Sequence, residues 1–265
     1  MRVLLLLLQQ SSAAASAATS TASVAAPVER WGRWEGSWHA ATAKIANPFT
    51  DVELTVELHG PSGGSDSSDS GLVSRSSSET AGGASSVLVR GFYDGEGLWR
   101  ARFMPPTVGA WTYRTRCATV SALDGKSGSF TVAAAAATNH GPVRVRENST
   151  TFAHADGTPF HAVGTTIYGL AGGVWGSNTG NVNKTAESLA TLATSPFNKV
   201  RMMAFPVDSV ARGGATYLPY ELTKNSSGAT ETDRTRFNLA FWQRLDRTIT
   251  SLLELDIQAR PFADY

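Results

Sequence analysis

The stretch "GFYDGEGLWRARFMP", residues 91–105, decides how the first half of the chain folds. It holds two carboxylates, Asp94 and Glu96, on either side of a glycine. Asp-Gly between runs of alternating apolar residues is the usual chemistry of a tight β-hairpin turn. A glycosidase pair of carboxylates instead faces a substrate from two sides, roughly 5–9.5 Å apart. We therefore interpret Asp94 and Glu96 as turn residues and expect a hairpin here.

The alternation continues on both sides of this turn. In "DVELTVELHG", residues 51–60, every second residue is apolar, so the apolar side chains share one face of a strand. In "LWRARF", residues 98–103, Arg100 and Arg102 fall on the face opposite the apolar side chains, which predicts that both point to solvent. Several short strands separated by Gly-rich turns indicate an immunoglobulin-like antiparallel β-sandwich over residues 27–138.

Two segments of this half are predicted to lie outside the sandwich. Residues 61–86 are rich in Ser, Gly and Asp, a composition typical of a disordered insertion. Residues 1–26 begin with Arg2 and an apolar run, followed by small residues, as secretory signal peptides do. The apolar run is shorter than the roughly 20 residues that span a bilayer. We expect a secreted, extracellular protein with no membrane span.

Three Asn-X-Ser/Thr tripeptides agree with that route. They predict glycosylation at Asn148, Asn183 and Asn225. Cys117 is the only cysteine, so the chain forms no internal disulfide. Its place at the end of a predicted strand favours a buried structural thiol over a nucleophile.

The pattern changes after residue 138. Strand, helix, strand, helix and strand follow one another, which indicates an α/β domain with a parallel sheet in residues 139–265. The first predicted segments are a hairpin around 155–157, a strand ending at 164–166, a helix near 184–194 and a strand within 197–206. A long loop then leads to a second helix, in which Phe241, Leu245, Ile249 and Leu252 or Leu253 recur at helical spacing. The last predicted segment is a strand within 257–262.

Charge and motifs argue against several function classes. The formal net charge is +1 over 265 residues, which gives no bulk field for nucleic acid. The Gly-rich stretch before Lys184 has Asn183 where a phosphate-binding loop requires glycine. The histidines show no helical ligand spacing and no neighbouring cysteine; they are His39, His59, His140, His154 and His161. We therefore expect no nucleic-acid partner, no nucleotide or other cofactor and no metal.

Several stretches carry a resemblance to a known family. "VERWGRWEGSW" and "GFYDGEGLWRARFMPPTVGAWTYRTR" resemble the immunoglobulin-like domain of unknown function that precedes the barrel in apiosidase-like glycoside hydrolases. "FAHADGTPFHAVGTTIYG" and "RFNLAFWQRLDRTITSLLELDIQA" resemble the start of that family's (β/α)8 catalytic domain. The resemblance implies a multidomain β plus α/β protein, in which an immunoglobulin-like sandwich is followed by an incomplete (β/α)8 (TIM) barrel in residues 139–265.

The resemblance also implies a sugar site. Thr165, Thr166 and Tyr168 would end the first barrel strand and line the floor of that site, and Arg201 would orient a nucleophilic carboxylate through its fixed fork of donors. The alternative is that Arg201 is a partly buried structural cation. The catalytic carboxylates would lie on later strands, beyond this chain, so no catalytic residue is assigned.

Three functions follow as alternatives. In the first, the chain is the N-terminal portion of a secreted glycoside hydrolase acting on plant or algal polysaccharide, truncated and inactive as written. In the second, it is a non-catalytic carbohydrate-binding or cell-surface module built on the sandwich. The third is a structural or adhesive secreted protein without sugar affinity. Carbohydrate is the expected partner in the first two, and the sequence leaves the sugar and the oligomeric state open.

Overall fold

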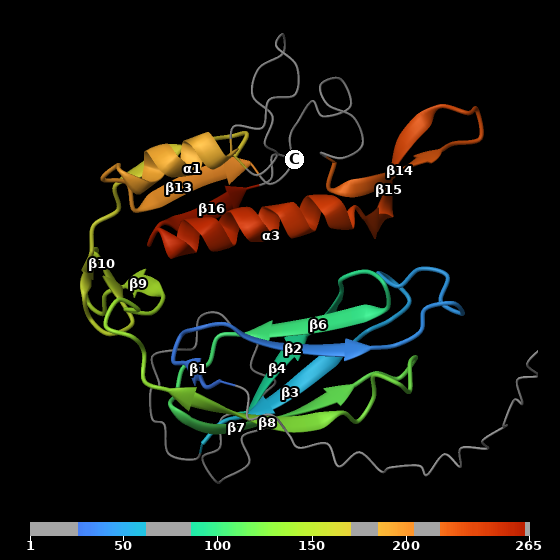
Figure 1. Ribbon diagram of the computed structural model, residues 1–265, viewed down its shortest axis with the longest axis horizontal. Coiled ribbons are helices and arrows are strands. Elements are labelled where there is room, and N and C mark those ends of the chain that lie inside the picture. The colour runs from blue at the N-terminus through green and yellow to red at the C-terminus, as the bar shows by residue number, and fades with distance from the viewer. Residues whose placement is uncertain (1–25, 62–85, 171–184, 204–217, 263–265) are drawn as a thin grey trace, which may run out of the picture.

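The chain forms two layered parts joined at one edge by a small sheet (Figure 1). The computed structural model describes residues 26–61, 86–170, 185–203 and 218–262. The predicted signal peptide, apart from its last residue, lies outside the described residues, and so does the Ser/Gly-rich insertion between its two end residues.

The first part is built from two β-sheets. One has five strands in the order β1-β8-β7-β3-β4, and the other has three in the order β2-β6-β5. All neighbouring strands are antiparallel except β1 and β8. The strand bounds are β1 Val28–Glu29, β2 Trp34–His39, β3 Thr55–His59, β4 Ser86–Arg90, β5 Phe92–Tyr93, β6 Leu98–Phe103, β7 Gly109–Arg116 and β8 Ser127–Ala133.

The predicted alternation places the apolar core between these two sheets. Trp99 and Ala101 of β6 are almost wholly buried, as are Val56 of β3 and Trp111 of β7, and they belong to one cluster. A buried tryptophan removes roughly 150–250 Å² from water, an upper estimate of about 4–6 kcal/mol. Cys117 is 4% exposed and belongs to the same core, which confirms the buried thiol.

The quoted stretch forms the hairpin β5–β6, as predicted. The Asp94 N–H donates to the Leu98 carbonyl at 2.8 Å, and the Leu98 N–H donates to the Gly95 carbonyl at 2.7 Å. The three residues between them have positive φ: 96° at Gly95, 48° at Glu96 and 72° at Gly97. Glycines at two of the three positions meet the geometry that the turn requires.

A small antiparallel sheet connects the two parts (Figure 1). It consists of β9 (Val143–Val145), β10 (Phe152–His154) and β11 (Pro159–Phe160), and the predicted hairpin joins β10 to β11. In its turn, Asp156 accepts from the Thr158 N–H and lies 2.7 Å from the His140 Nδ1 atom. The Thr158 backbone, and then His140, lower the pKa of Asp156 to about 2.

The second part is a three-stranded parallel sheet with helices packed on one face. Its strands are β12 (Gly164–Thr166), β13 (Lys199–Met203) and β16 (Gln258–Phe262), in that order. The helices of the described residues are α1 (Thr185–Ala193) and α3 (Leu239–Glu254). The core residues come from both layers; they include Val200, Met202, Phe241, Leu245 and Leu252, while Leu253 is 61% exposed.

A hairpin replaces part of the predicted long loop. It consists of β14 (Tyr220–Lys224) and β15 (Thr230–Phe237), and it projects from the body of the molecule (Figure 1). The sequence of β15, TETDRTRF, has an apolar residue only at its end. Without an alternating apolar pattern, the sequence offered no signal for a strand.

The predicted incomplete (β/α)8 barrel is wrong. The described residues are mostly strands with two helices, and they contain no closed barrel. A barrel of this kind closes eight parallel strands inside a ring of helices. The parallel strands described here form an open sheet of three, and the other sheets are largely antiparallel. The structure supports a β-rich fold, and the immunoglobulin-like layout of the sandwich stays a prediction.

Candidate functional site

The parallel sheet brings several predicted site residues onto one of its faces. Thr166 of β12 is the register partner of Arg201 of β13, and Arg201 is the register partner of Arg260 of β16. All three side chains are exposed. Register partners on neighbouring strands share one face, and ligands of open parallel sheets bind beyond the carboxyl ends of the strands. This end of the sheet is therefore a candidate binding site.

The other two predicted residues lie on either side of this row. Thr165 pairs with the buried Val200, so it belongs to the face that the helices cover. Tyr168 follows β12, is 54% exposed, and accepts a hydrogen bond from the Met203 N–H through its backbone carbonyl at 3.3 Å. The structure thus gathers Thr166, Tyr168 and Arg201 at one end of the sheet, and Thr165 faces the opposite way.

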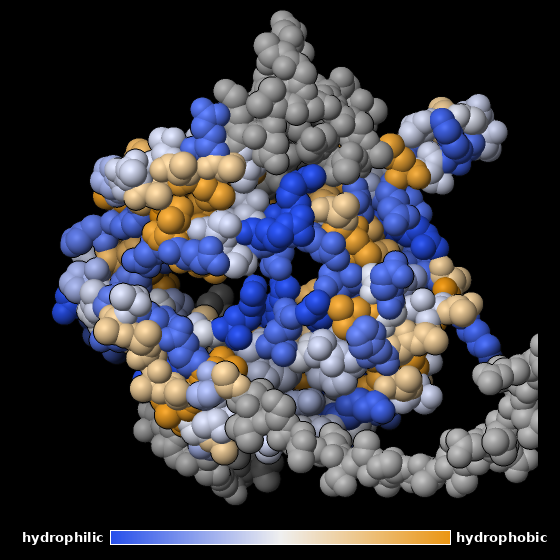
Figure 2. Space-filling model, in the orientation of Figure 1, coloured by the Kyte–Doolittle hydropathy of each residue, from blue (hydrophilic) through white to orange (hydrophobic). Residues whose placement is uncertain are grey.

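A cavity of about 860 Å³ lies between the sandwich and α3. Figure 2 shows hydrophilic side chains gathered around the hollow between the two parts. Arg102 of β6 donates to both carboxylate oxygens of Asp246 of α3 at 2.8 and 2.9 Å, and to Glu35 at 2.6 Å. Arg100 donates to Glu35 and, at 2.5 Å, to Asp94. The prediction that both arginines face solvent is wrong, because both line this cavity and are partly buried. Arg102 also bonds a helix residue 144 positions further along the chain.

The hydrogen bonds to these carboxylates change the pKa of Arg102. Burial disfavours the charge on Arg102, but hydrogen bonds to Asp246 and Glu35 outweigh it and raise the pKa of the guanidinium. The ion pair between Arg102 and Asp246 joins β6 of the sandwich to α3.

Aromatic rings continue the contact beside the ion pairs. Tyr93 and Phe49 of the sandwich lie with ring centroids 5.4 Å apart, and Phe49 lies 5.5 Å from Phe237 of β15. Phe237 in turn lies 5.6 Å from Trp242 of α3. Edge-on contacts between aromatic rings at these distances add stability beyond that of the buried apolar area.

Sequence reasoning missed this interface. Gln243 and Asp246 are three residues apart on the predicted helix, so they share a face. Gln243 donates to the Asp94 side chain and backbone at 3.1 Å. Two polar side chains on one face of this helix were the sequence signal for a polar contact. The sequence did not identify the strand that they contact.

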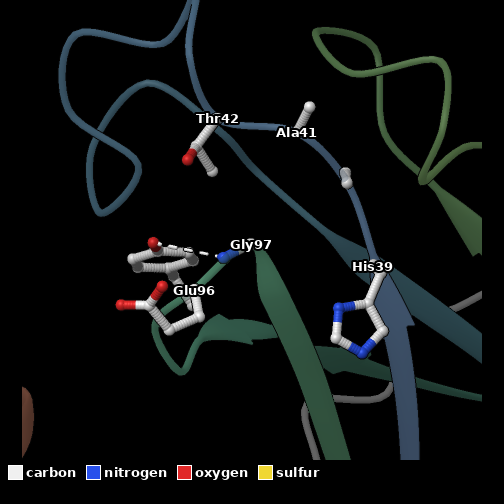
Figure 3. Close-up of a pocket in the computed structure, with 7 residues that line it drawn as sticks. His39, Ala41, Thr42, Glu96 and Gly97 are labelled. Atoms are coloured by element: carbon white, nitrogen blue, oxygen red, sulfur yellow. Dashed lines mark hydrogen bonds between the residues drawn. The ribbon is translucent and has the colours of Figure 1, made fainter.

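A second cavity, of about 500 Å³, lies at the β5–β6 turn (Figure 3). His39 and Glu96 lie on either side of Gly97, whose N–H donates to the Tyr93 hydroxyl at 3.4 Å. Glu96 is the acid among its lining residues. The cavity therefore offers hydrogen-bonding groups but no facing pair of carboxylates.

The predicted glycosylation sites have different settings. Asn148 is exposed in the turn between β9 and β10, with φ of 54°. Asn225 lies in the β14–β15 turn, where its Oδ1 atom accepts from the Ser227 and Ala229 N–H groups at 3.1 and 2.9 Å. Asn183 lies outside the described residues.

Within the described ranges, no three His, Cys, Asp or Glu side chains are grouped to hold a metal ion. None of the helices in that part of the chain combines the length and the apolar character needed to cross a bilayer.

Comparison with known proteins finds one family model and several solved structures that are similar to this chain. A family described as "Domain of unknown function (DUF5060)" matches residues 77–118. No curated protein matches the chain. Among the solved structures that match is one described as "a putative glycoside hydrolase from Bacteroides vulgatus ATCC 8482". It is 32% identical, with a TM-score of 0.67 over 89% of this chain, and the match covers 41% of that structure's chain. This chain thus spans less than half of the length of its structural neighbour.

Proposed function

We propose that this chain is a sugar-binding portion of a secreted, glycoside-hydrolase-like protein that acts on plant or algal polysaccharide. The observation that carries the proposal is the similarity to the Bacteroides vulgatus structure over 89% of this chain. The resemblance of the quoted segments to apiosidase-like glycoside hydrolases supports the same class. Secretion and glycosylation at Asn148, Asn183 and Asn225 belong to the proposal.

The proposed site is the face of the parallel sheet that carries Thr166 of β12 and Arg201 of β13. The Thr166 hydroxyl and the Arg201 guanidinium, which are register partners, offer donors to sugar hydroxyl groups. The exposed ring of Tyr168 offers an apolar surface with a polar tip, which suits the face of a sugar ring. Thr165 supports the strand from the side that the helices cover.

We also propose that these residues bind sugar without hydrolysing it. Strands β12, β13 and β16 contain no Asp or Glu. The carboxylates of the interface cavity accept hydrogen bonds from arginines or from Gln243. Hydrolysis of a glycosidic bond usually requires two opposed carboxyl groups with different protonation states.

Binding is tested by titrating the purified chain with a panel of plant and algal oligosaccharides in a calorimeter. At least one oligosaccharide binds, and Arg201→Ala weakens that binding about tenfold or more, the loss of a charge-assisted hydrogen bond. Arg90→Ala is the matched control, because Arg90 is an 85% exposed side chain on the sandwich. Thermal melts of both variants separate a binding role of Arg201 from the alternative of a structural cation. Absence of binding by every glycan would refute the proposal.

A further inference from the structure

We infer that the cavity between the sandwich and α3 is a separate binding site, and that it takes a short neutral saccharide. The cavity has a volume of about 860 Å³ and is lined by side chains from β5, β6, β15 and α3. Small-molecule sites have volumes of roughly 300–1,000 Å³ and often lie where two parts of a protein meet. The residues of this cavity differ from those of the parallel sheet, so the inference does not need the sheet to bind sugar.

One carboxylate fixes two hydrogen-bonding side chains that line the cavity. The Asp94 Oδ2 atom accepts from Arg100 Nε at 2.5 Å, and its Oδ1 atom accepts from Gln243 Nε2 at 3.1 Å. Arg100 donates to Glu35 through Nη1 as well. Within the described residues, Arg100 Nη2 and Gln243 Oε1 have no hydrogen-bond partner. A donor and an acceptor, both held in place by Asp94, are therefore available to a ligand.

Phe92 supplies an apolar wall beside these groups. It is the register partner of Arg100, so both side chains lie on the face of the small sheet that meets α3. The Arg102 guanidinium lies 5.2 Å from the centroid of its ring. Unlike the rings that pack against one another across the interface, Phe92 is 37% exposed. An aromatic ring beside a few placed polar groups suits a sugar, which has apolar C–H faces and hydroxyl edges.

The charges around the cavity favour a ligand without charge. Four arginines and three acidic residues line it, so their charges nearly cancel. Each of the acids, Glu35, Asp94 and Asp246, accepts a hydrogen bond from Arg100 or Arg102, and the other two arginines are exposed to solvent. A charged ligand would compete with these ion pairs, and separating a partly buried pair costs free energy. Hydroxyl groups donate and accept without displacing a pair.

The experiment titrates the full chain in a calorimeter with disaccharides. Cellobiose, xylobiose and galactobiose are the neutral probes, and digalacturonic acid is the acidic one. We expect at least one neutral disaccharide to bind, and to bind more tightly than digalacturonic acid does.

Two variants locate the binding. Phe92→Ala removes the apolar wall and is expected to weaken binding of the neutral disaccharide about tenfold. Gln243→Leu keeps a side chain of similar size without the acceptor and is expected to weaken binding about fivefold. Leu88→Ala is the matched control, because Leu88 is a 40% exposed apolar residue of β4 that does not line the cavity. It is expected to bind as the wild type does.

Hydrogen exchange of the wild-type chain locates the site without any substitution. The bound disaccharide is expected to slow amide exchange in peptides that cover β5, the β5–β6 turn and α3. This measurement decides the question even where Phe92→Ala or Gln243→Leu fails to fold.

The outcomes separate this inference from the proposed function. Binding that Phe92→Ala weakens and Arg201→Ala leaves unchanged supports the cavity and contradicts the site on the parallel sheet. Binding that only Arg201→Ala weakens, or protection confined to β12 and β13, overturns the cavity site and leaves the proposed function standing. Tighter binding of digalacturonic acid overturns the neutral ligand and with it this inference. No binding of any sugar overturns both.

Discussion

At the scale of single residues, the turn at Asp94–Gly97 shows how backbone conformation decides the role of a side chain. Glu96 has φ of 48° between two glycines with φ of 96° and 72°. Asp94 closes the turn through its backbone and bonds Arg100 through its carboxylate. Both acids belong to this turn, so the sequence-based interpretation of a turn is confirmed. The role of Asp94 in the interface was not predictable, because it depends on a helix far along the chain.

Gly97 gives a residue-scale prediction. A Cβ atom at this position would lie 2.7 Å from the Ala40 carbonyl oxygen, a backbone atom that cannot rotate away. Gly97→Ala is expected to destabilise the chain by about 2–3 kcal/mol, through both the positive φ and this contact. Gly125→Ala is the control, since Gly125 has φ of 66° but a nearest neighbour at 3.8 Å; it is expected to cost about 1 kcal/mol. Denaturant midpoints measure both, and equal losses would contradict the steric argument.

At the scale of elements, the sequence predicted the strands and helices that carry a periodic apolar pattern. The helix around Phe241 and Leu245 was predicted from its spacing, and its buried face confirms it. The hairpin β14–β15 was missed because its strands lack such a pattern. The sequence also could not predict which element a polar face contacts, because residue spacing within one helix or strand carries no information about its neighbours in the fold. For the candidate site, the family resemblance alone supplied Thr166, Tyr168 and Arg201, whereas Arg260 emerged only from the strand register.

The bidentate pair between β6 and α3 gives a prediction at this scale. A double-mutant cycle of Arg102→Ala and Asp246→Ala is expected to show a coupling energy near 1 kcal/mol, falling as salt rises. The geometry favours a strong pair, but side-chain exposures of 32% and 37% let solvent screen it. Arg116 and Glu57 form the control pair, on neighbouring strands with Arg116 62% exposed, and a smaller coupling is expected there. Coupling between Arg102 and Asp246 no larger than that of the control would mean that the pair does not hold the interface.

At the scale of the whole molecule, two separate cores meet through a mixed interface. The core of the sandwich draws all of its buried residues from positions 34–132, and that of the α/β part draws its own from positions 170–257. No cluster of buried residues is shared between them in the described part of the chain. The parts instead meet through the ion pairs of Arg102 and through the rings of Phe49 and Phe237. Each part can therefore bury its core alone, whereas the orientation of one part relative to the other depends on the contacts of this interface.

The last prediction follows from this division. Residues 27–138, expressed alone, are expected to unfold cooperatively with β-type circular dichroism, because their core is complete without the second part. Their melting temperature is expected to lie roughly 5–10 °C below that of the sandwich in the full chain, since the loss of the interface costs about 1–2 kcal/mol. Phe49→Ser in the full chain serves as the comparison and is expected to reproduce part of the decrease, because it removes the ring between Tyr93 and Phe237. A melt without cooperativity would show that the sandwich requires α3 to fold, whereas an unchanged melting temperature would show that the interface contributes no stability.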